Sequence, residues 1–314
     1  MALPGRELLL DALKGGVLTL ALFLAYVTFP VIGLLPGIFT PLPAIYYFCK
    51  RGAAAGVAIC IITTAVLLAM AENAVPVLYL LQAGIISLLL PWYYLQGKGT
   101  ARAIAYPVGI NFLLIVALAV AYGFWSGTDL QATLLKGIEH STEQAIAVYS
   151  KQGLSAEDLE MLTQGIRQAG ALIAQVFPAL LLVALGSIAA LNMGALFSLA
   201  ARWLPNLPRP ERFQSFRNPD LLIWVVIGAG FSMLLPQPDL QRAALNLLLV
   251  SGFIYFLQGL AVVLAFFERI SVPPLARFIF WLVLTFQPYL VLAIALLGIF
   301  DIWADFRTPK EKNL

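Results

Sequence analysis

The side chains of this chain that could bind a ligand are uncharged amides that fall inside long apolar stretches. They are Gln82, Asn111, Gln175, Asn192, Asn246, Gln258 and Gln287. An amide in hydrocarbon costs free energy unless it meets water or a hydrogen-bonding partner, so such residues usually face the protein interior. Four of them are the candidate ligand-binding residues: Asn111, Gln175, Asn192 and Gln258. The alternative is hydrogen bonding between helices, which is worth about 0.6–2 kcal/mol for each contact.

Groups that would support catalysis are scarce. His140 is the only histidine, and it lies in an acidic loop, where a solvated role is expected. The sequence contains no G-x-x-x-x-G-K-[ST] phosphate loop, no H-E-x-x-H motif and no C-x-x-C pair. Cys49 and Cys60 fall beside or inside apolar stretches and are expected to be small apolar residues. The sequence therefore predicts a protein that is not an enzyme and that has no catalytic residue, metal site or cofactor.

The elements that must position the amides are membrane-spanning helices. The 314 residues are 61% hydrophobic and 11% charged, with a mean hydropathy of +0.91. Soluble domains average about 25% charged residues. The net charge of +3 is small, so nucleic acid is not an expected partner. The expected fold class is all-α, a polytopic transmembrane helical bundle.

Apolar stretches of roughly 20 residues cross a bilayer as helices. The candidate spans, in chain order, are Val17–Leu35, Ile38–Cys49, Ala53–Met70, Val75–Leu95, Ala103–Phe124, Ala171–Ala201, Leu221–Leu235, Leu245–Phe267 and Leu275–Phe300. The second is short, and the ninth is interrupted at Gln287-Pro288. If the second is re-entrant, or the ninth is a bent hairpin, one span is lost and the carboxy-terminal tail changes sides. We therefore expect about eight or nine spans, preceded by a short interfacial helix at Leu8–Lys14.

The charges of the loops predict which side of the membrane they occupy. Residues 126–167 carry six acids and three bases, whereas residues 202–220 carry four arginines and two acids. Short basic loops stay in the cytoplasm. Residues 126–167 are therefore expected to form an extracytoplasmic loop of two amphipathic helices, Leu130–Ser150 and Ser155–Arg167, between spans five and six. The expected domains are a six-span core at 1–201, a basic cytoplasmic loop at 202–219, and membrane helices with a polar tail at 220–314.

Two features predict how the helices pack. One face of the sixth span reads Gly186, Ala190 and Gly194, and small residues at this spacing let helices approach closely in lipid. We expect this span to be the hub against which other helices pack. The second feature is the tail, where acids alternate with aromatic residues between Asp301 and Arg307. We expect an ordered tail in which Arg307 pairs with a carboxylate or with carbonyls at a helix end.

Three stretches of the second half resemble a known family. They are Arg212–Trp224, which reads RFQSFRNPDLLIW, the pair Asn246–Leu248 and Tyr255–Ala261, and Gly298–Arg307. They resemble the YybS-like (DUF2232) family of bacterial multi-pass membrane proteins. The resemblance implies a protein of the bacterial cytoplasmic (inner) membrane. It implies no activity, and it carries over no catalytic or binding residue.

The first 201 residues are similar in topology to the S components of energy-coupling-factor vitamin transporters. That similarity implies a subunit that binds a small solute and borrows a separate ATPase. The helices expected after the sixth span depart from the pattern of S components. Topology alone does not establish function.

Two functions therefore remain open. One is a small-solute-binding or transport-type subunit without its own ATPase; the other is a non-catalytic scaffold or interaction protein. The expected partners are the lipid bilayer, a small-molecule ligand, and a membrane protein or a separate ATPase module. An outward-opening pocket lined by Asn111, Gln175 and Asn192 would favour transport. Pairing of these amides across helix contacts would favour the scaffold.

Overall fold

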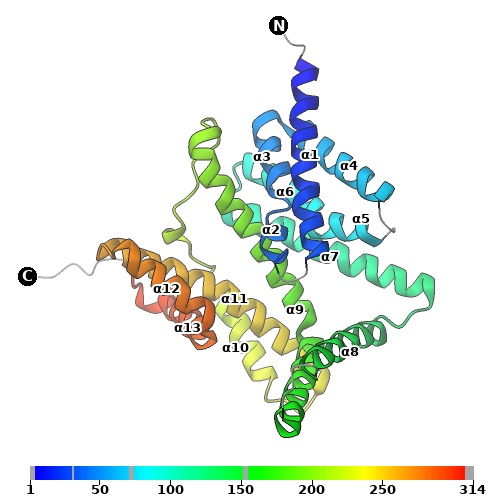
Figure 1. Cartoon of the computed structure of the whole chain (residues 1–314). Coiled ribbons are helices and arrows are strands. Elements are labelled where there is room, and N and C mark those ends of the chain that lie inside the picture. The colour runs from blue at the N-terminus through cyan, green and yellow to red at the C-terminus, as the bar shows by residue number, and fades with distance from the viewer. Residues whose placement is uncertain (1–3, 30–31, 71–73, 151–154, 308–314) are drawn as a thin grey trace, which may run out of the picture. The chain divides into compact units, whose positions relative to one another are not determined.

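A computed structural model describes residues 4–29, 32–70, 74–150 and 155–307 of the chain (Figure 1). These residues form helices and connecting turns, with no strand among them, which confirms the all-α fold class. The chain divides into two compact units. Unit 1 comprises Met1–Trp125 and Ala184–Glu211, and unit 2 comprises Ser126–Val183 and Arg212–Leu314. Residues 126–183 thus group with the carboxy-terminal helices in unit 2; the expected domains stay a prediction.

Unit 1 contains α1 (Pro4–Thr28), α2 (Leu34–Ile38), α3 (Leu42–Arg51), α4 (Ala53–Met70), α5 (Ala74–Tyr79), the π-helical turn η1 (Leu80–Gly84), α6 (Ile85–Leu95), α7 (Thr100–Ser126) and the second part of α9 (Ala156–Trp203). The interfacial helix expected at Leu8–Lys14 is not separate from the first span, because α1 runs through both. Gly15 does not break α1 but lets α4 approach it. A Cβ at Gly15 would lie 2.3 Å from the Ile59 side chain.

Ion pairs join the start of α1 to the end of α3. Asp11 is buried, and its carboxylate accepts a hydrogen bond of 2.8 Å from Arg51 Nε and lies 3.6 Å from Lys50 Nζ. Glu7 lies 3.1 Å from the Arg51 guanidinium. These contacts hold the polar first turns of α1 against the basic end of α3.

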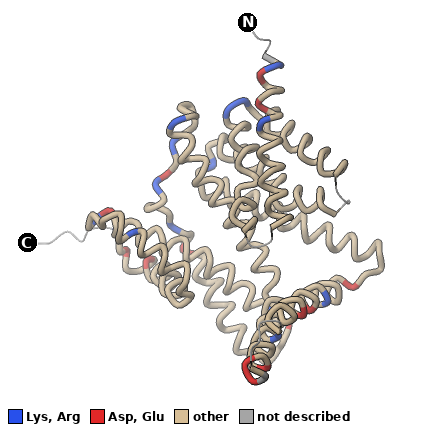
Figure 2. The backbone as a smooth tube through the Cα atoms, in the orientation of Figure 1, with Lys and Arg blue, Asp and Glu red and all other residues tan. Residues whose placement is uncertain are grey.

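Unit 2 contains α8 (Leu130–Tyr149), the first part of α9, the 3₁₀ turn η3 (Phe213–Ser215), α10 (Leu222–Ser232), α11 (Pro238–Arg269), α12 (Pro274–Phe286) and α13 (Pro288–Ala304). Asp129 caps α8 by accepting hydrogen bonds from the Gln131 and Ala132 N–H groups. Ser155 caps α9 by accepting from the Asp158 N–H. Figure 2 shows that acidic residues gather on α8 and on the first turns of α9.

The structure has fewer helices long enough to span a membrane than the eight or nine spans predicted from the sequence. Among the described residues, six helices are long and apolar enough by length and composition, or seven spans result if the bent pair α12 and α13 counts as one. The three expected spans that fall short are the second, seventh and ninth. The second is the 10-residue α3, the seventh is the 11-residue α10, and the ninth bends by 108° between α12 and α13. The amphipathic helix expected after Ser155 is instead continuous with the sixth span, as α9 of 48 residues.

The expectation that the sixth span is the hub stays a prediction. The closest packing among the described helices joins α1, α3 and α4 in unit 1 and α10, α11 and α13 in unit 2. Within the second part of α9 the most buried side chains include Leu185, Ala189 and Leu196, which lie to one side of the expected ladder. Gly186 is buried, Ala190 is half-buried and Gly194 is exposed. An added Cβ at Gly194 would meet no atom within 4 Å, so Gly194 makes no close contact with another described helix.

The side of the membrane on which each loop lies can be tested with thiol labelling. Ser141→Cys on α8 and Ser215→Cys in η3 both place a thiol at an exposed position. On a background in which Cys49 and Cys60 are replaced, a membrane-impermeant reagent added to intact cells should label the Ser141→Cys variant and not the Ser215→Cys variant, because basic loops stay inside. Labelling of both variants after lysis is the control. The reverse pattern on intact cells would overturn the assignment.

Candidate functional site

Two of the expected ligand-binding amides satisfy backbone carbonyls where helices are irregular. Asn111 is fully buried, and its Nδ2 donates to the Leu81 carbonyl in the π-helical turn at 2.7 Å. Asn192, also buried, donates from Nδ2 to the Ile38 carbonyl at the break between α2 and α3, at 2.7 Å. A π-helical turn or a helix break leaves carbonyls without their usual partners. Both amides therefore stabilise interrupted helices in unit 1.

Gln175 contributes its backbone, not its side chain, to a similar arrangement in unit 2. Its side chain is exposed, whereas its carbonyl accepts from Asn246 Nδ2 at 2.8 Å. Asn246 Oδ1 accepts in turn from the Ala179 N–H at 2.9 Å. In a regular α-helix the Ala179 N–H would donate to the Gln175 carbonyl. The Asn246 side chain of α11 bonds to both groups, and Ala179 directly follows Pro178. This contact ties the first part of α9 to α11.

Gln258 lies in a buried polar network of unit 2. Its Oε1 accepts from the Asn218 N–H at 2.9 Å, and its Nε2 donates to Asp301 Oδ2 at 3.1 Å. Gln258 is fully buried, and Asp301 is only 1% exposed. Helices α11 and α13 bring these residues together because Gly259 and Gly298 carry no side chain at their crossing. A Cβ at Gly298 would lie 2.0 Å from the Tyr255 carbonyl oxygen.

Arg307 closes the network. Its guanidinium donates to Asp301 Oδ2 at 2.6 Å and to the Gln214 and Phe216 carbonyls at 2.9 and 2.7 Å. The Phe306 N–H also donates to Asp301 Oδ1, at 3.3 Å. The expectation that Arg307 pairs with a carboxylate is therefore confirmed. Helix α13 ends at Ala304, and Asp305 adopts a left-handed φ of 39°.

The three stretches that carry the family resemblance meet in this network. Asn218 comes from the first, Gln258 from the second, and Asp301 and Arg307 from the third. Beside it lies a cavity of about 560 Å³. The residues that line this cavity are Arg212, Gln214, Ser215, Ala265, Phe266, Glu268, Arg269, Phe306 and Arg307. None of the four amides expected to bind a ligand lines it, and those amides are divided between the two units.

A second polar feature lies inside unit 1, and the sequence analysis missed it. Thr19, Thr63 and Tyr79 are fully buried, and within the described part of the chain none of their hydroxyl oxygens forms a hydrogen bond of standard geometry. The Tyr79 hydroxyl lies beside Thr63 and the Cys60 thiol. Gly15 packs on Ile59, and Phe23 shares a core cluster with Leu67 and Tyr79. Thr19 is one helical turn from both Gly15 and Phe23 on α1, and Thr63 is one turn from both Ile59 and Leu67 on α4. The two threonines therefore lie between α1 and α4.

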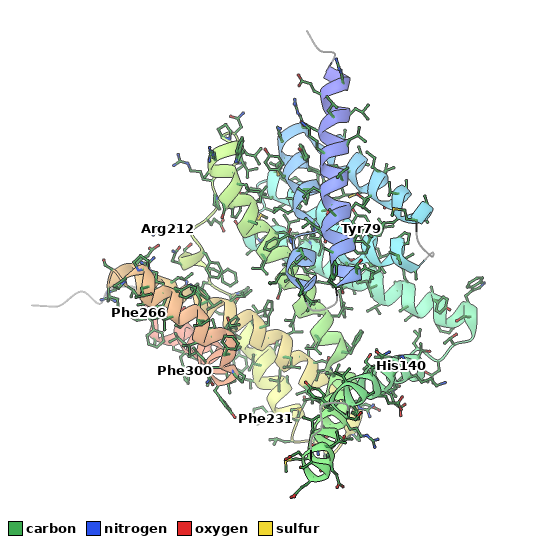
Figure 3. All side chains as sticks on the ribbon, in the orientation of Figure 1. Tyr79, His140, Arg212, Phe231, Phe266 and Phe300 are labelled. Carbon is green, nitrogen blue, oxygen red and sulfur yellow. The ribbon has the colours of Figure 1, made fainter. Side chains whose placement is uncertain are left out.

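The signal for this cluster was weak in the sequence. Threonine and tyrosine are common in membrane helices and often bond to their own backbone, as Thr64 does with the Cys60 carbonyl. Only the packing shows that Thr63 and Tyr79 have no such partner. Figure 3 marks Tyr79 among the helices of unit 1. Buried polar atoms are nearly always hydrogen-bonded, so this group of hydroxyls is the candidate polar site of unit 1.

Comparison with known proteins identifies one match. The family described as "Predicted membrane protein (DUF2232)" matches residues 17–302. No curated protein and no solved structure matches the chain. In the described part of the chain, no group of three His, Cys, Asp or Glu residues could hold a metal ion.

Proposed function

We propose that this chain, which belongs to the DUF2232 family of predicted membrane proteins, is a small-solute-binding, transport-type subunit. In this proposal it is not an enzyme, has no ATPase of its own and resides in the bacterial cytoplasmic membrane. Its partner would be a separate ATPase module or another membrane protein. The solute site is the hydroxyl cluster of Thr19, Thr63 and Tyr79.

The observation that carries the proposal is the burial of three hydroxyls without partners. Each hydroxyl can donate one hydrogen bond and accept two, and leaving such a group unpaired costs about 1–3 kcal/mol. A chain gains nothing from three such groups together unless something binds them. The cluster offers donors and acceptors but no charge, so it suits a small, uncharged polar solute.

Interrupted helices near this cluster support the same function. Tyr79 directly precedes the π-helical turn Leu80–Gly84, and the break between α2 and α3 lies in the same unit. Irregular backbone at membrane depth is tolerated where it is buried in protein or lines a binding cavity, and transporters place substrates beside such interruptions. Thr19 and Thr63 each fall well inside α1 and α4, away from the helix ends.

The test separates stability from binding. Thr63→Val and Tyr79→Phe should raise the thermal stability of the detergent-purified protein, because each removes a buried unpaired polar atom worth about 1–3 kcal/mol. The same variants should lose a small molecule that native mass spectrometry detects on the wild-type protein. Thr64→Val is the matched control, since the Thr64 hydroxyl already bonds to the Cys60 carbonyl, and it should keep the molecule. Retention of the molecule by both Thr63→Val and Tyr79→Phe would overturn the site.

A scaffold or interaction protein is the second candidate, and the amides favour it. Asn111, Asn192 and Asn246 bond to backbone groups across helix contacts and do not meet in one cavity. For a scaffold, the wild-type protein would carry no small molecule, while Thr63→Val and Tyr79→Phe would still gain stability. That outcome would replace the transport function with the scaffold.

A further inference from the structure

The cavity beside the polar network of unit 2 has a basic wall. Arg212, Arg269 and Arg307 contribute guanidinium groups, against the single carboxylate of Glu268. Glu268 is already engaged, because Arg212 donates to its Oε2 and Gln214 Nε2 donates to its Oε1 at 2.6 Å. Asp301 likewise neutralises Arg307. Among the ion pairs of the described residues none involves Arg269, which leaves the cavity with an uncompensated positive charge.

The remaining wall of the cavity is apolar. Ala265 and Phe266 come from the last turns of α11, and Phe306 follows α13. Figure 3 marks Arg212 and Phe266 within unit 2. Ile270, directly after α11, is 68% exposed, and Trp303 is 66% exposed. The cavity thus combines guanidinium groups with the apolar side chains of Ala265, Phe266 and Phe306, a combination suited to an amphiphilic molecule.

The cavity lies at the edge of the expected membrane. α11 is one of the helices long and apolar enough to span, and Arg269 is its last residue. Arg212 and Ser215 come from the loop that is expected to face the cytoplasm. The cytoplasmic leaflet carries anionic phospholipids, and basic pockets at this level bind their headgroups. The volume of about 560 Å³ lies within the range of small-molecule sites, about 300–1,000 Å³.

We propose that this cavity binds the phosphate group of an anionic phospholipid. Arg269 and the Arg212 guanidinium face the phosphate, Ser215 lies beside them, and Phe266 and Phe306 pack against the first part of the acyl chains. Bound lipid would join the loop before α10, the end of α11 and the residues after α13. The site lies wholly in unit 2 and does not rest on the solute site of unit 1.

The experiment measures lipid binding to the full-length protein by native mass spectrometry. Detergent-purified protein is titrated with phosphatidylglycerol, with phosphatidylcholine and with inorganic phosphate. The wild-type protein should retain phosphatidylglycerol more tightly than phosphatidylcholine. Arg269→Gln should weaken phosphatidylglycerol binding about fivefold, the contribution of one basic residue near an anionic surface. Arg269→Lys should restore most of the binding, because it restores the charge.

Arg242→Gln is the matched control, since Arg242 is an exposed arginine near the opposite end of the same helix α11. It should bind phosphatidylglycerol as the wild-type protein does. Equal binding by the Arg269→Gln and Arg242→Gln variants, with both folded, would overturn the proposal. Equal affinity for the two lipids would overturn it as well. Saturable binding of inorganic phosphate that competes out the lipid would assign the cavity to a soluble phosphate compound instead.

Discussion

Asp301→Ala is expected to lower the free energy of unfolding by about 3–5 kcal/mol, the usual effect of breaking a buried ion pair. The substitution leaves the Arg307 guanidinium, whose side chain is only 14% exposed, without its carboxylate. It also removes the acceptor of the Gln258 amide and of the Phe306 N–H. Asp301 accepts from Gln258, Phe306 and Arg307, so the loss should exceed that of most substitutions.

Reversible unfolding in mixed micelles, followed by tryptophan fluorescence, provides the measurement. Asp239→Ala is the control, because Asp239 is a fully exposed acid that lies 3.8 Å from Arg242, and it should not change stability measurably. The double variant Asp301→Ala with Arg307→Met should lose less stability than the sum of the two single variants, since no buried charge remains alone. If Asp301→Ala were as stable as Asp239→Ala, Asp301 would not be the centre of the network.

The sequence predicted the order of the tail but not the importance of Asp301. Alternation of acids and aromatic residues was sufficient to predict an ordered segment and a partner for Arg307. The depth of Asp301 could not be predicted in the same way, because it depends on the close approach of α13 to the Tyr255 carbonyl at Gly298. In the sequence, Asp301 follows an apolar run and resembles a solvated flank. In the structure it lies inside the last turn of α13.

Helices were predictable where apolar runs were long, and less so where they were short. α4 and α11 match runs of 18 or more apolar residues. The runs that became α2, α3 and α10 are apolar enough for a membrane, but Pro36, Pro41 and Pro236 limit the length of the helices near them. Hydropathy measures composition and not helix length, so it overestimates the number of spans where prolines interrupt a run.

The candidate sites illustrate a different limit. Amides were chosen from the sequence because they are polar groups within apolar runs, and the Nδ2 groups of Asn111, Asn192 and Asn246 do find backbone carbonyls, whereas Oδ1 of Asn111 and of Asn192 has no partner among the described residues. Thr63 and Tyr79 were not weighed in the sequence analysis, and their hydroxyls form no hydrogen bond of standard geometry among the described residues. Whether a polar group is paired depends on the neighbours that other helices supply. Those neighbours are not encoded in local spacing, so binding residues could not be ranked from composition.

Gly259→Ala and Gly298→Ala should each destabilise unit 2 by about 1–3 kcal/mol, the usual range for overpacking, or prevent its folding. A Cβ at Gly259 would lie 1.9 Å from the Ile294 carbonyl oxygen, and one at Gly298 would lie 2.0 Å from that of Tyr255. Backbone atoms of α11 and α13 cannot move aside as a flexible side chain can. A single methyl group therefore forces the two helices apart and separates Gln258 from Asp301.

Gly252→Ala on the same helix α11 is the matched control, because an added Cβ there meets no atom within 4 Å. It should raise stability slightly, since alanine is favoured over glycine within a helix by about 0.5–1 kcal/mol. Opposite signs for Gly252→Ala and Gly259→Ala in one thermal-unfolding series would show that the close approach of α11 and α13, and not helix propensity, determines the result. Stabilisation by both substitutions would mean that the two helices do not touch at Gly259, and the network around Asp301 would then lose its structural basis.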